Sequence, residues 1–362
     1  MLLANRAHAS QPVNDTASVL KLMHRVADWQ LDSIERNGLR HGSREWTSAT
    51  LFTGLMALAD LSKNDRYEHY MRTAVGEQYS WKLYHDKYRY YADNYCVGQL
   101  YCWIYEKDKN PDIIEDLVEM ADTLNARPHE EDLAWRNDIA LREWAWCDAL
   151  FMGPPTLAML ADITGNDTYL DLTDKLWWKT TAYLYDETEK LFFRDQTYFD
   201  RREKNGAKVF WSRGNGWVVA GLARVLTHMP KDYKTRTKWE RLYKDMLARI
   251  ITFQQPDGFW RTSLLDPNRY PAKESSGTAL FLYAVAWGIN NGLLERDIYD
   301  RYVDLAWKAL EDTVHDSGKL GYVQQVGEAP GNVHYNDTEI YGVGAFLLAG
   351  AEVFKLKAQS SR

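Results

Sequence analysis

Two aspartates stand at matching places in the chain, and paired carboxyl groups are the usual equipment for breaking glycosidic bonds. Asp93 and Asp148 each lie five residues before a glycine that opens an apolar stretch. Carboxyl groups on either side of one bond can act as general acid and base. Asp148 stands between Trp146 and Phe151, an apolar setting that raises a carboxyl pKa and keeps a proton available. The alternative is that each aspartate only caps a helix.

The most specific string in the chain is Trp-Ser-Arg-Gly-Asn-Gly-Trp at 211–217. Its glycines allow the backbone to approach a ligand closely. Trp211 and Trp217 offer faces on which a sugar ring can pack, and Arg213 offers paired N–H donors for a carboxylate. The alternative is a glycine-rich helix start with core tryptophans. Arg194-Asp195 is a second candidate, for which the alternative is a surface ion pair.

Polar or aromatic residues precede most of the apolar helical stretches. If the helices form a ring, these segments meet at one mouth, where helix N-termini favour an anionic ligand. The remaining residues that we expect to bind substrate are Trp46, Trp146, Glu274, Ser275 and His334.

The elements that must position these residues are helices. Hydrophobic periodicity predicts them at 16–37, 46–63, 67–79, 93–107, 112–125, 144–164, 167–183, 215–228, 232–255, 275–291, 296–313 and 338–356. Six apolar helices alternate with six amphipathic ones, which predicts an all-α (α/α)6 toroid. A helical solenoid shows the same alternation, but the long, varied loops favour the toroid. Residues 191–199 and 208–211 flank Lys204-Asn205-Gly206 and predict a small β-hairpin in a mouth loop.

Domain organisation follows from the absence of a Pro/Gly/Ser linker. We expect an N-terminal tail at 1–15 and one barrel domain at 16–362. The N-terminus lacks a proper hydrophobic signal region, so a cytoplasmic start and the remnant of a trimmed export signal both stay open. The oligomeric state is equally open.

Composition excludes several classes of protein. The net charge of −7 offers no basic stripe for nucleic acid. Three cysteines without a CxxC pair and nine histidines without HExxH or HxH spacing make a disulfide framework and a transition-metal site improbable. No apolar run is long enough to span a membrane. The aromatic share of 14% suits both carbohydrate binding and a core of large rings.

Several of these segments resemble one enzyme family. The string at 211–217, the segments YADNYCVGQ and DALFMGP, and ESSGTALFLYAVAWGINNGLL are similar to unsaturated uronyl hydrolases of glycoside hydrolase family 105, to which family 88 is related. The resemblance implies an (α/α)6 barrel without metal or organic cofactor. It implies removal of a 4,5-unsaturated uronic acid from the non-reducing end of oligosaccharides left by polysaccharide lyases.

The resemblance also implies a mechanism and its residues. An aspartate, Asp148 by motif match, protonates C4 of the enol ether and water adds at C5. Asp93 matches the second active-site aspartate, and Trp146, Trp211, Arg213 and Trp217 match sugar-pocket positions. One departure stands out: where better-known members carry a histidine, this chain has Arg194. The source of the oligosaccharide therefore stays open among rhamnogalacturonan, ulvan, arabinogalactan and glycosaminoglycan.

Two other functional classes compete. The first is another (α/α)6 sugar enzyme, either an inverting glycosidase for saturated acidic oligosaccharides or an epimerase. Epimerases of this shape rely on paired histidines, and only His334 stands at a suitable place. The second is a non-catalytic carbohydrate-binding or scaffold protein.

Overall fold

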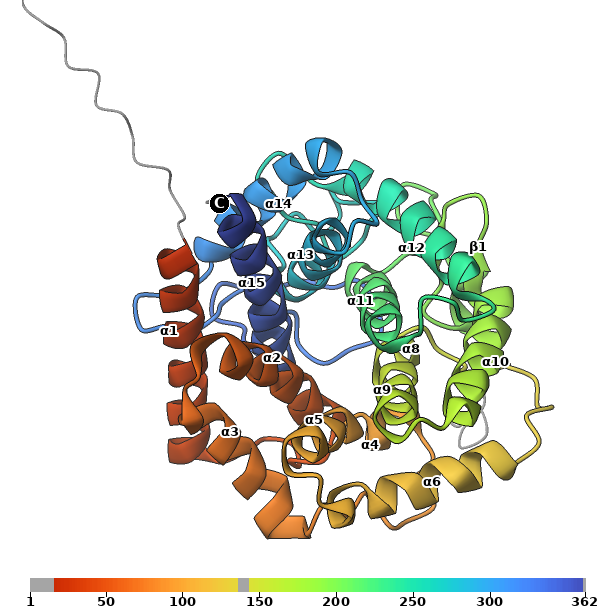
Figure 1. The fold of residues 1–362 in the computed structure, drawn as a ribbon. Helices are drawn as coiled ribbons and strands as arrows, with labels where there is room; N and C mark the ends of the chain where they lie inside the picture. The colour runs from red at the N-terminus through yellow and green to blue at the C-terminus, as the bar shows by residue number, and fades with distance from the viewer. Residues whose placement is uncertain (1–15, 136–142, 361–362) are drawn as a thin grey trace, which may run out of the picture.

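The computed structural model describes residues 16–135 and 143–360, so the tail predicted at 1–15 lies outside it. Two concentric rings of helices make up the fold (Figure 1). The described residues form the inner ring from α2 (Trp46–Ser62), α5 (Gly98–Asp108), α9 (Pro154–Thr164), α11 (Ser212–His228), α13 (Ser275–Asn290) and α15 (Ile340–Ser360). They form the outer ring from α1 (Thr16–Asn37), α3 (Asp65–Met71), α6 (Glu115–Ala126), α10 (Asp167–Leu184), α12 (Arg236–Ile250) and α14 (Arg296–Glu311).

The helices of the two rings differ in how many of their side chains are buried. In α13 every residue from Ser275 to Ile289 is buried. In α14 the buried residues recur every three or four positions, as expected for a helix with one wet face. They are Tyr299, Val303, Ala306, Trp307, Ala309 and Leu310.

Contact between the first and last inner helices closes the ring. Helix α15 packs against both α13 and α2, which confirms the toroid and excludes the solenoid. Glycines permit this contact. A Cβ atom on Gly54 would lie 2.4 Å from the carbonyl oxygen of Gly344, and one on Gly344 would lie 2.1 Å from that of Thr50.

The helix predicted at 144–164 is wrong in its first part. Trp144 has a φ of 59°, in the left-handed region, so no helix can start there. The chain instead forms the short helix α8 (Ala149–Met152), and α9 begins at Pro154. Proline suits this first turn because its missing N–H is not needed there. The stretch at 93–107 is likewise divided, into α4 (Ala92–Tyr95) and α5.

The hairpin also has different strands from those predicted. Strand β1 (Tyr185–Asp186) pairs with β2 (Leu191–Phe192) in an antiparallel two-stranded sheet that follows α10. The turn around Asn205 does form, with a bridge between Arg202 and Lys208, but Trp211 pairs with Ser263 instead of the 191–199 segment. The smaller helical turns are a π-helix at Arg72–Glu77 and 3-10 turns at Pro111–Ile113, Gln196–Tyr198 and Ile251–Phe253.

Replacing a ring-closing glycine should destabilise the whole barrel. We expect Gly344→Ala to cost about 1–3 kcal/mol of unfolding free energy, because its methyl group meets backbone that cannot rotate away. Thermal and urea denaturation measure this. Gly327→Ala is the control, because its Cβ would meet nothing closer than 3.7 Å. Equal melting temperatures for the two variants would contradict the role of this contact.

Candidate active site

A cavity of about 360 Å³ lies at the end of the barrel where the inner helices begin. It collects residues from α2, α4, α8 and α11, together with three irregular segments: the one before α8, the one that holds Arg194 and the loop before α15. Its lining residues are Trp46, Asp93, Trp146, Asp148, Met152, Arg194, Arg213, Val326, Gly327 and Glu328. Six of the residues predicted from the sequence therefore meet in one cavity, although they come from segments up to 167 residues apart, Trp46 to Arg213.

Neither aspartate caps a helix with its side chain. Asp148 occupies the N-cap position of α8, but its carboxyl accepts no hydrogen bond from the following N–H groups. Asp93 lies inside α4, whose N-cap is Tyr91. The capping alternative is therefore wrong for both residues, and both carboxyl groups face the cavity.

Arg194 lies beside Asp148, with its Nε atom 3.9 Å from Oδ2 of the carboxyl group. The backbone fixes this neighbourhood, because the Cys147 N–H donates to the carbonyl oxygen of Arg194 at 2.8 Å. The guanidinium also binds Asp195 at 2.6 Å and lies 4.5 Å from the ring centre of Trp135. Its side chain is 13% exposed, so the pair is part of the cavity wall and the surface ion-pair alternative is wrong.

The two carboxyl groups hold protons unusually tightly. Burial raises the pKa of Asp93 to about 7, the charge of Asp148 adds to the rise, and Arg194 opposes it. Burial also raises the pKa of Asp148, against the opposing charges of Arg194 and Arg213. Near neutral pH the pair can therefore keep one proton, which is what a general acid needs.

A buried charge cluster holds the segment that leads to Asp148. The Glu143 carboxylate lies 2.9 Å from both His129 Nδ1 and Lys179 Nζ. Burial acts in the opposite direction, but these two partners lower the pKa of Glu143 to about 2. The next residue, Trp144, donates from its indole to Tyr95 at 2.7 Å and accepts from Thr180 at 2.8 Å. These bonds hold its left-handed backbone and aim the following residues at the cavity.

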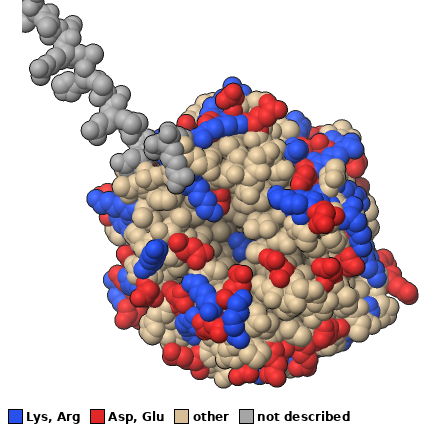
Figure 2. Space-filling model, in the orientation of Figure 1, with Lys and Arg blue, Asp and Glu red and all other residues tan. Residues whose placement is uncertain are grey.

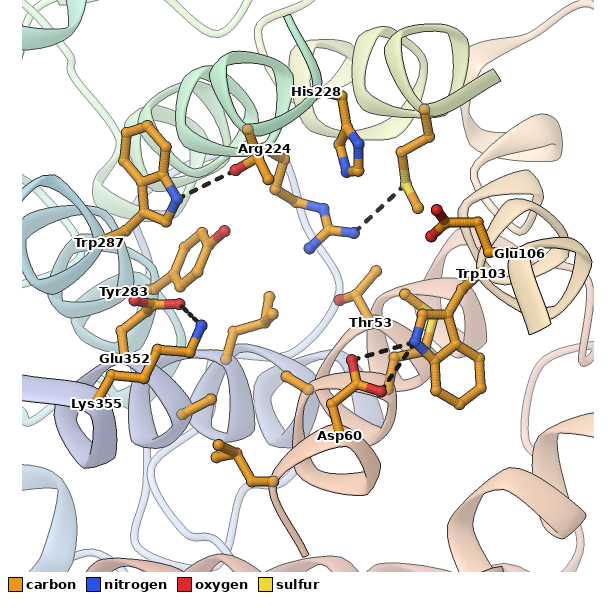
Figure 3. A pocket seen from close by; sticks show the side chains of 17 residues that line it. Thr53, Asp60, Trp103, Glu106, Arg224, His228, Tyr283, Trp287, Glu352 and Lys355 are labelled. Atoms are coloured by element: carbon orange, nitrogen blue, oxygen red, sulfur yellow. Dashed lines mark hydrogen bonds and ion pairs between the residues drawn. The ribbon is translucent and has the colours of Figure 1, made fainter. Parts of the chain in front are cut away.

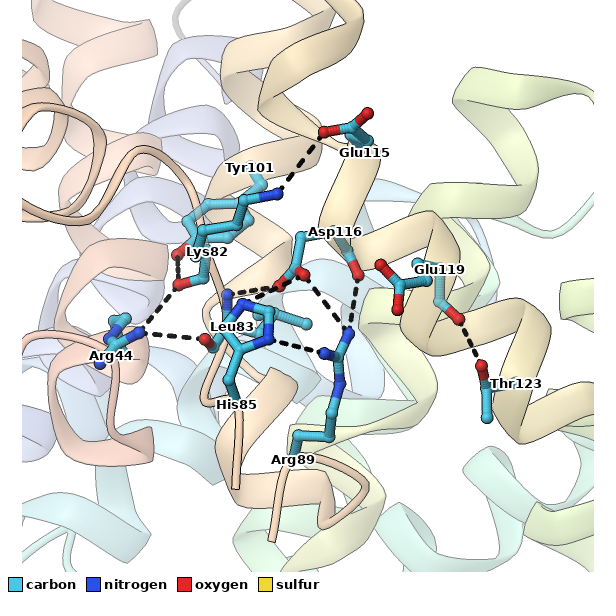
Figure 4. Close-up of polar contacts among 10 residues, drawn as sticks. All are labelled: Arg44, Lys82, Leu83, His85, Arg89, Tyr101, Glu115, Asp116, Glu119 and Thr123. Atoms are coloured by element: carbon cyan, nitrogen blue, oxygen red, sulfur yellow. Dashed lines mark hydrogen bonds and ion pairs between the residues drawn. The ribbon is translucent and has the colours of Figure 1, made fainter. Parts of the chain in front are cut away.

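A second anchor holds the segment that leads to Asp93 (Figure 4). Asp116, buried on α6, accepts a hydrogen bond from the Leu83 N–H at 2.7 Å. It also lies 3.3 Å from Nε2 of His85 and 3.4 Å from Arg89. This carboxylate thus ties the loop between α3 and α4 to the outer ring, immediately before Asp93.

Arg213 lines the cavity as predicted, but the protein itself engages most of its guanidinium. Its guanidinium donates to the carbonyl oxygens of Gln324 at 2.9 Å and Gln325 at 3.0 Å. The rings of Trp211 and Tyr341 lie 4.4 and 4.9 Å from it. Most of its donors are therefore taken by the protein, and Arg213 is 1% exposed. It reaches the cavity wall chiefly as a clamp on the loop before α15.

The other predicted sugar-pocket residues lie outside the cavity wall. Trp217 is buried against Trp46 and Phe151, and the Trp211 indole donates to Gln324 at 2.9 Å.

Glu274 caps α13 by accepting from two backbone N–H groups, and Ser275 donates to the carbonyl oxygen of Gly321. His334 is 78% exposed and lies 3.1 Å from Asp337. These contacts explain all five side chains through packing, capping or surface pairing.

Sequence reasoning missed Met152 and the loop segment Val326, Gly327 and Glu328. Met152 follows Asp148 by one turn of α8, so the helical period could have found it. The loop segment carries no motif, and contacts with Arg213 and Gln324 place it at the cavity.

A second cavity lies at the opposite end of the barrel, where the inner helices end (Figure 3). Arg224 projects into it and is held by Gln99 at 2.6 Å. Asp60 accepts from the Trp103 indole, and Glu352 pairs with Lys355. None of the residues predicted for chemistry lies here.

The face seen in Figure 2 is hollowed near its centre and carries both signs of charge around the rim.

Residues 16–135 and 143–360 contain neither a membrane-spanning helix nor a metal-binding cluster. None of the helices among them is long and apolar enough to cross a membrane. Within the same residues, no group of three His, Cys, Asp or Glu side chains is arranged to hold a metal ion. Cys96, Cys102 and Cys147 are free and buried.

Comparison with known proteins agrees with this geometry. The model of the family described as Glycosyl Hydrolase Family 88 matches residues 22–357. The chain belongs to this family. It is a glycoside hydrolase with the six-hairpin barrel, and it matches the family that the sequence resemblance had placed beside family 105. A solved glycoside hydrolase described as from family 105 and two described as possible members share the fold at 16% to 18% identity.

More similar relatives are found among curated proteins and solved structures. An unsaturated 3S-rhamnoglycuronyl hydrolase from Formosa agariphila is 39% identical over 86% of this chain and 85% of its own length. One from Alteromonas sp. is 31% identical over 95% and 88%. A family 88 structure from Bacteroides vulgatus has 32% identity and a TM-score of 0.85, covering 94% of this chain and 99% of that one. A chain described as a polysaccharide lyase also has 32% identity and a TM-score of 0.85, covering 95% and 98%.

The raised pKa of Asp93 predicts a pH-dependent effect on stability. The folded protein holds this proton more tightly than the unfolded chain, so the contribution of Asp93 to stability should fall as pH rises from about 4 to about 7. We expect Asp93→Asn to be more stable than wild type by about 1–3 kcal/mol near pH 8, with the gain vanishing near pH 4. Thermal melts across this range measure it, with the exposed Asp316→Asn as control. A gain independent of pH would contradict the assignment.

Proposed function

We propose that the enzyme removes a 4,5-unsaturated uronic acid from the non-reducing end of oligosaccharides produced by a polysaccharide lyase. One observation carries the proposal: the carboxyl group of Asp148 makes no helix-capping hydrogen bond and shares a cavity with Asp93 and Arg194. The cavity thus offers a proton donor and a cation together. An acidic enol ether requires both groups, one for its alkene and one for its carboxylate.

In the proposed reaction Asp148 donates its proton to C4 of the unsaturated ring. The C4=C5 double bond is consumed, and positive charge develops on C5 and the ring oxygen. Water then adds at C5 and returns a proton to the Asp148 carboxylate. The resulting hemiketal opens by breaking the bond between C5 and the ring oxygen, and the hemiacetal left at C1 releases the neighbouring sugar. No bond is displaced at the anomeric carbon in the catalysed step.

The surrounding residues support each part of this sequence. Burial and the charge of Asp148 raise the pKa of Asp93 to about 7, so the pair of Asp93 and Asp148 keeps a proton near neutral pH. Trp46 and Trp146 line the cavity and offer apolar surface to the sugar ring. Arg194 is the better partner for the substrate carboxylate, because both Nη atoms of Arg213 donate to backbone carbonyl oxygens, whereas among the described residues Arg194 donates through Nη1 alone, to Asp195. The substrate-binding role predicted for Arg213 thus passes in this proposal to Arg194.

The substrate class that we favour is a rhamnoglycuronyl oligosaccharide. Both curated relatives above 30% identity are described as unsaturated 3S-rhamnoglycuronyl hydrolases, and the chain covers most of their length. Lyase digests of ulvan, pectic and glycosaminoglycan polysaccharides, supplied side by side, test this choice by loss of the alkene absorbance. Fastest loss on a digest without rhamnoglycuronyl units would contradict it.

The Asp148→Asn variant tests the proposed proton donor. Asparagine keeps the shape of the side chain but cannot donate the proton, so we expect alkene loss to slow by about 10²–10⁴-fold. Asp60→Asn is the matched control, because Asp60 lies in the cavity at the other end of the barrel and should leave the rate unchanged.

The same assay separates the competing functions. Full activity of Asp148→Asn would overturn the assignment of the acid. A rise of the alkene signal on intact polysaccharide would indicate a lyase instead. Release of reducing sugar from saturated oligosaccharides alone would indicate an ordinary glycosidase, and binding without turnover would indicate a non-catalytic protein.

A further inference from the structure

Glu328 forms a loose ion pair with Arg194 at the rim of the cavity. Its Oε2 atom lies 3.7 Å from Nη1 of the guanidinium, beyond hydrogen-bond distance. The glutamate side chain is 60% exposed, whereas that of Arg194 is 13% exposed. The Arg194 guanidinium is therefore part of the cavity wall, whereas the Glu328 carboxylate that faces it is largely in contact with solvent.

The backbone on both sides of Glu328 is fixed independently of this pair. The Gly327 carbonyl oxygen accepts from Arg213 at 3.5 Å, and the Ala329 carbonyl oxygen accepts from the Gln324 side chain at 2.8 Å. Gln324 in turn accepts from the Trp211 indole at 2.9 Å. Rotation of the Glu328 side chain thus breaks its contact with Arg194 and leaves the loop in place.

The Arg194 guanidinium has N–H donors that Glu328 does not contact, because Glu328 lies nearest to Nη1. Asp195 binds Nη1 at 2.6 Å, and the buried Nε lies 3.9 Å from Oδ2 of Asp148. Among the described residues Nη2 donates no hydrogen bond, so it is the donor open to a ligand. A carboxylate or sulfate entering the cavity can bind a guanidinium closely through two N–H groups, and such a bond is stronger than an exposed contact at 3.7 Å. A neutral hydroxyl brings no charge to replace that of Glu328.

We propose that Glu328 is a displaceable counter-ion of Arg194, which holds the guanidinium until an anionic group of the sugar takes its place. The inference rests on the proposed function for the nature of the sugar. It makes Glu328 and Arg194 together a selectivity device. An anion displaces the glutamate at little cost, whereas a neutral sugar must either leave it in position or separate the pair without a replacement charge.

The first experiment measures binding without catalysis. Calorimetry gives dissociation constants of wild type, Glu328→Gln and Asp316→Asn for glucuronate, for inorganic sulfate and for glucose. We expect Glu328→Gln to bind an anion about two- to five-fold more tightly, the equivalent of one weak exposed ion pair, with glucose unaffected. The glucuronate and sulfate arms show which anion the position prefers. Asp316→Asn removes an exposed carboxylate from the same connection between α14 and α15 and should match wild type.

A double-mutant cycle makes the test specific to the pair. In an Arg194→Gln background, Glu328→Gln should have no further effect on anion binding, because the cation that it neutralises is gone. Anion affinity that is unchanged or weakened in Glu328→Gln would overturn the inference, as would the same gain in the Arg194→Gln background. Failure of the wild-type enzyme to consume any unsaturated substrate would overturn the proposed function instead, and the binding results would still decide the role of Glu328.

Discussion

The burial of two carboxyl groups in one cavity is the interaction on which the rest of the site depends. The charge of Asp148 disfavours that of Asp93, and burial disfavours the charge of both. A cavity of this kind would expel one charge if no cation faced it. Arg194 supplies that cation from a separate segment, tied to Cys147 through the backbone and to Asp195 through its side chain. In the proposed function, acidity and anion binding therefore come from the same three residues.

Closure of the inner ring makes this arrangement possible. The inner helices begin at one end of the barrel, so the segments before them converge there, including the long connections that carry Arg194 and Glu328. The glycine contact between α2 and α15 closes the ring, while Asp116 and Glu143 anchor the segments before the two aspartates. The outer-ring side chains of Asp116 on α6 and Lys179 on α10 thus help to position the segments that carry the two aspartates.

Much of this could be predicted from the sequence because helical periodicity is local and strong. The two aspartates were found because each precedes a glycine at the same distance. The backbone of Trp144 could not be foreseen, since its left-handed turn depends on partners at Tyr95 and Thr180. Arg213 was expected to bind substrate, but its carbonyl partners lie more than a hundred residues away. Glu328 carries no motif at all, and only the fold brings it to Arg194.

The central claim is that the enzyme hydrates an enol ether instead of displacing a group at the anomeric carbon. Turnover of an unsaturated disaccharide in deuterated water enriched in heavy oxygen tests it most directly, with the products followed by NMR and mass spectrometry. The account predicts deuterium at C4 and heavy oxygen at C5 of the released uronic acid product. Heavy oxygen at C1, with the double bond intact at the moment of cleavage, would contradict it.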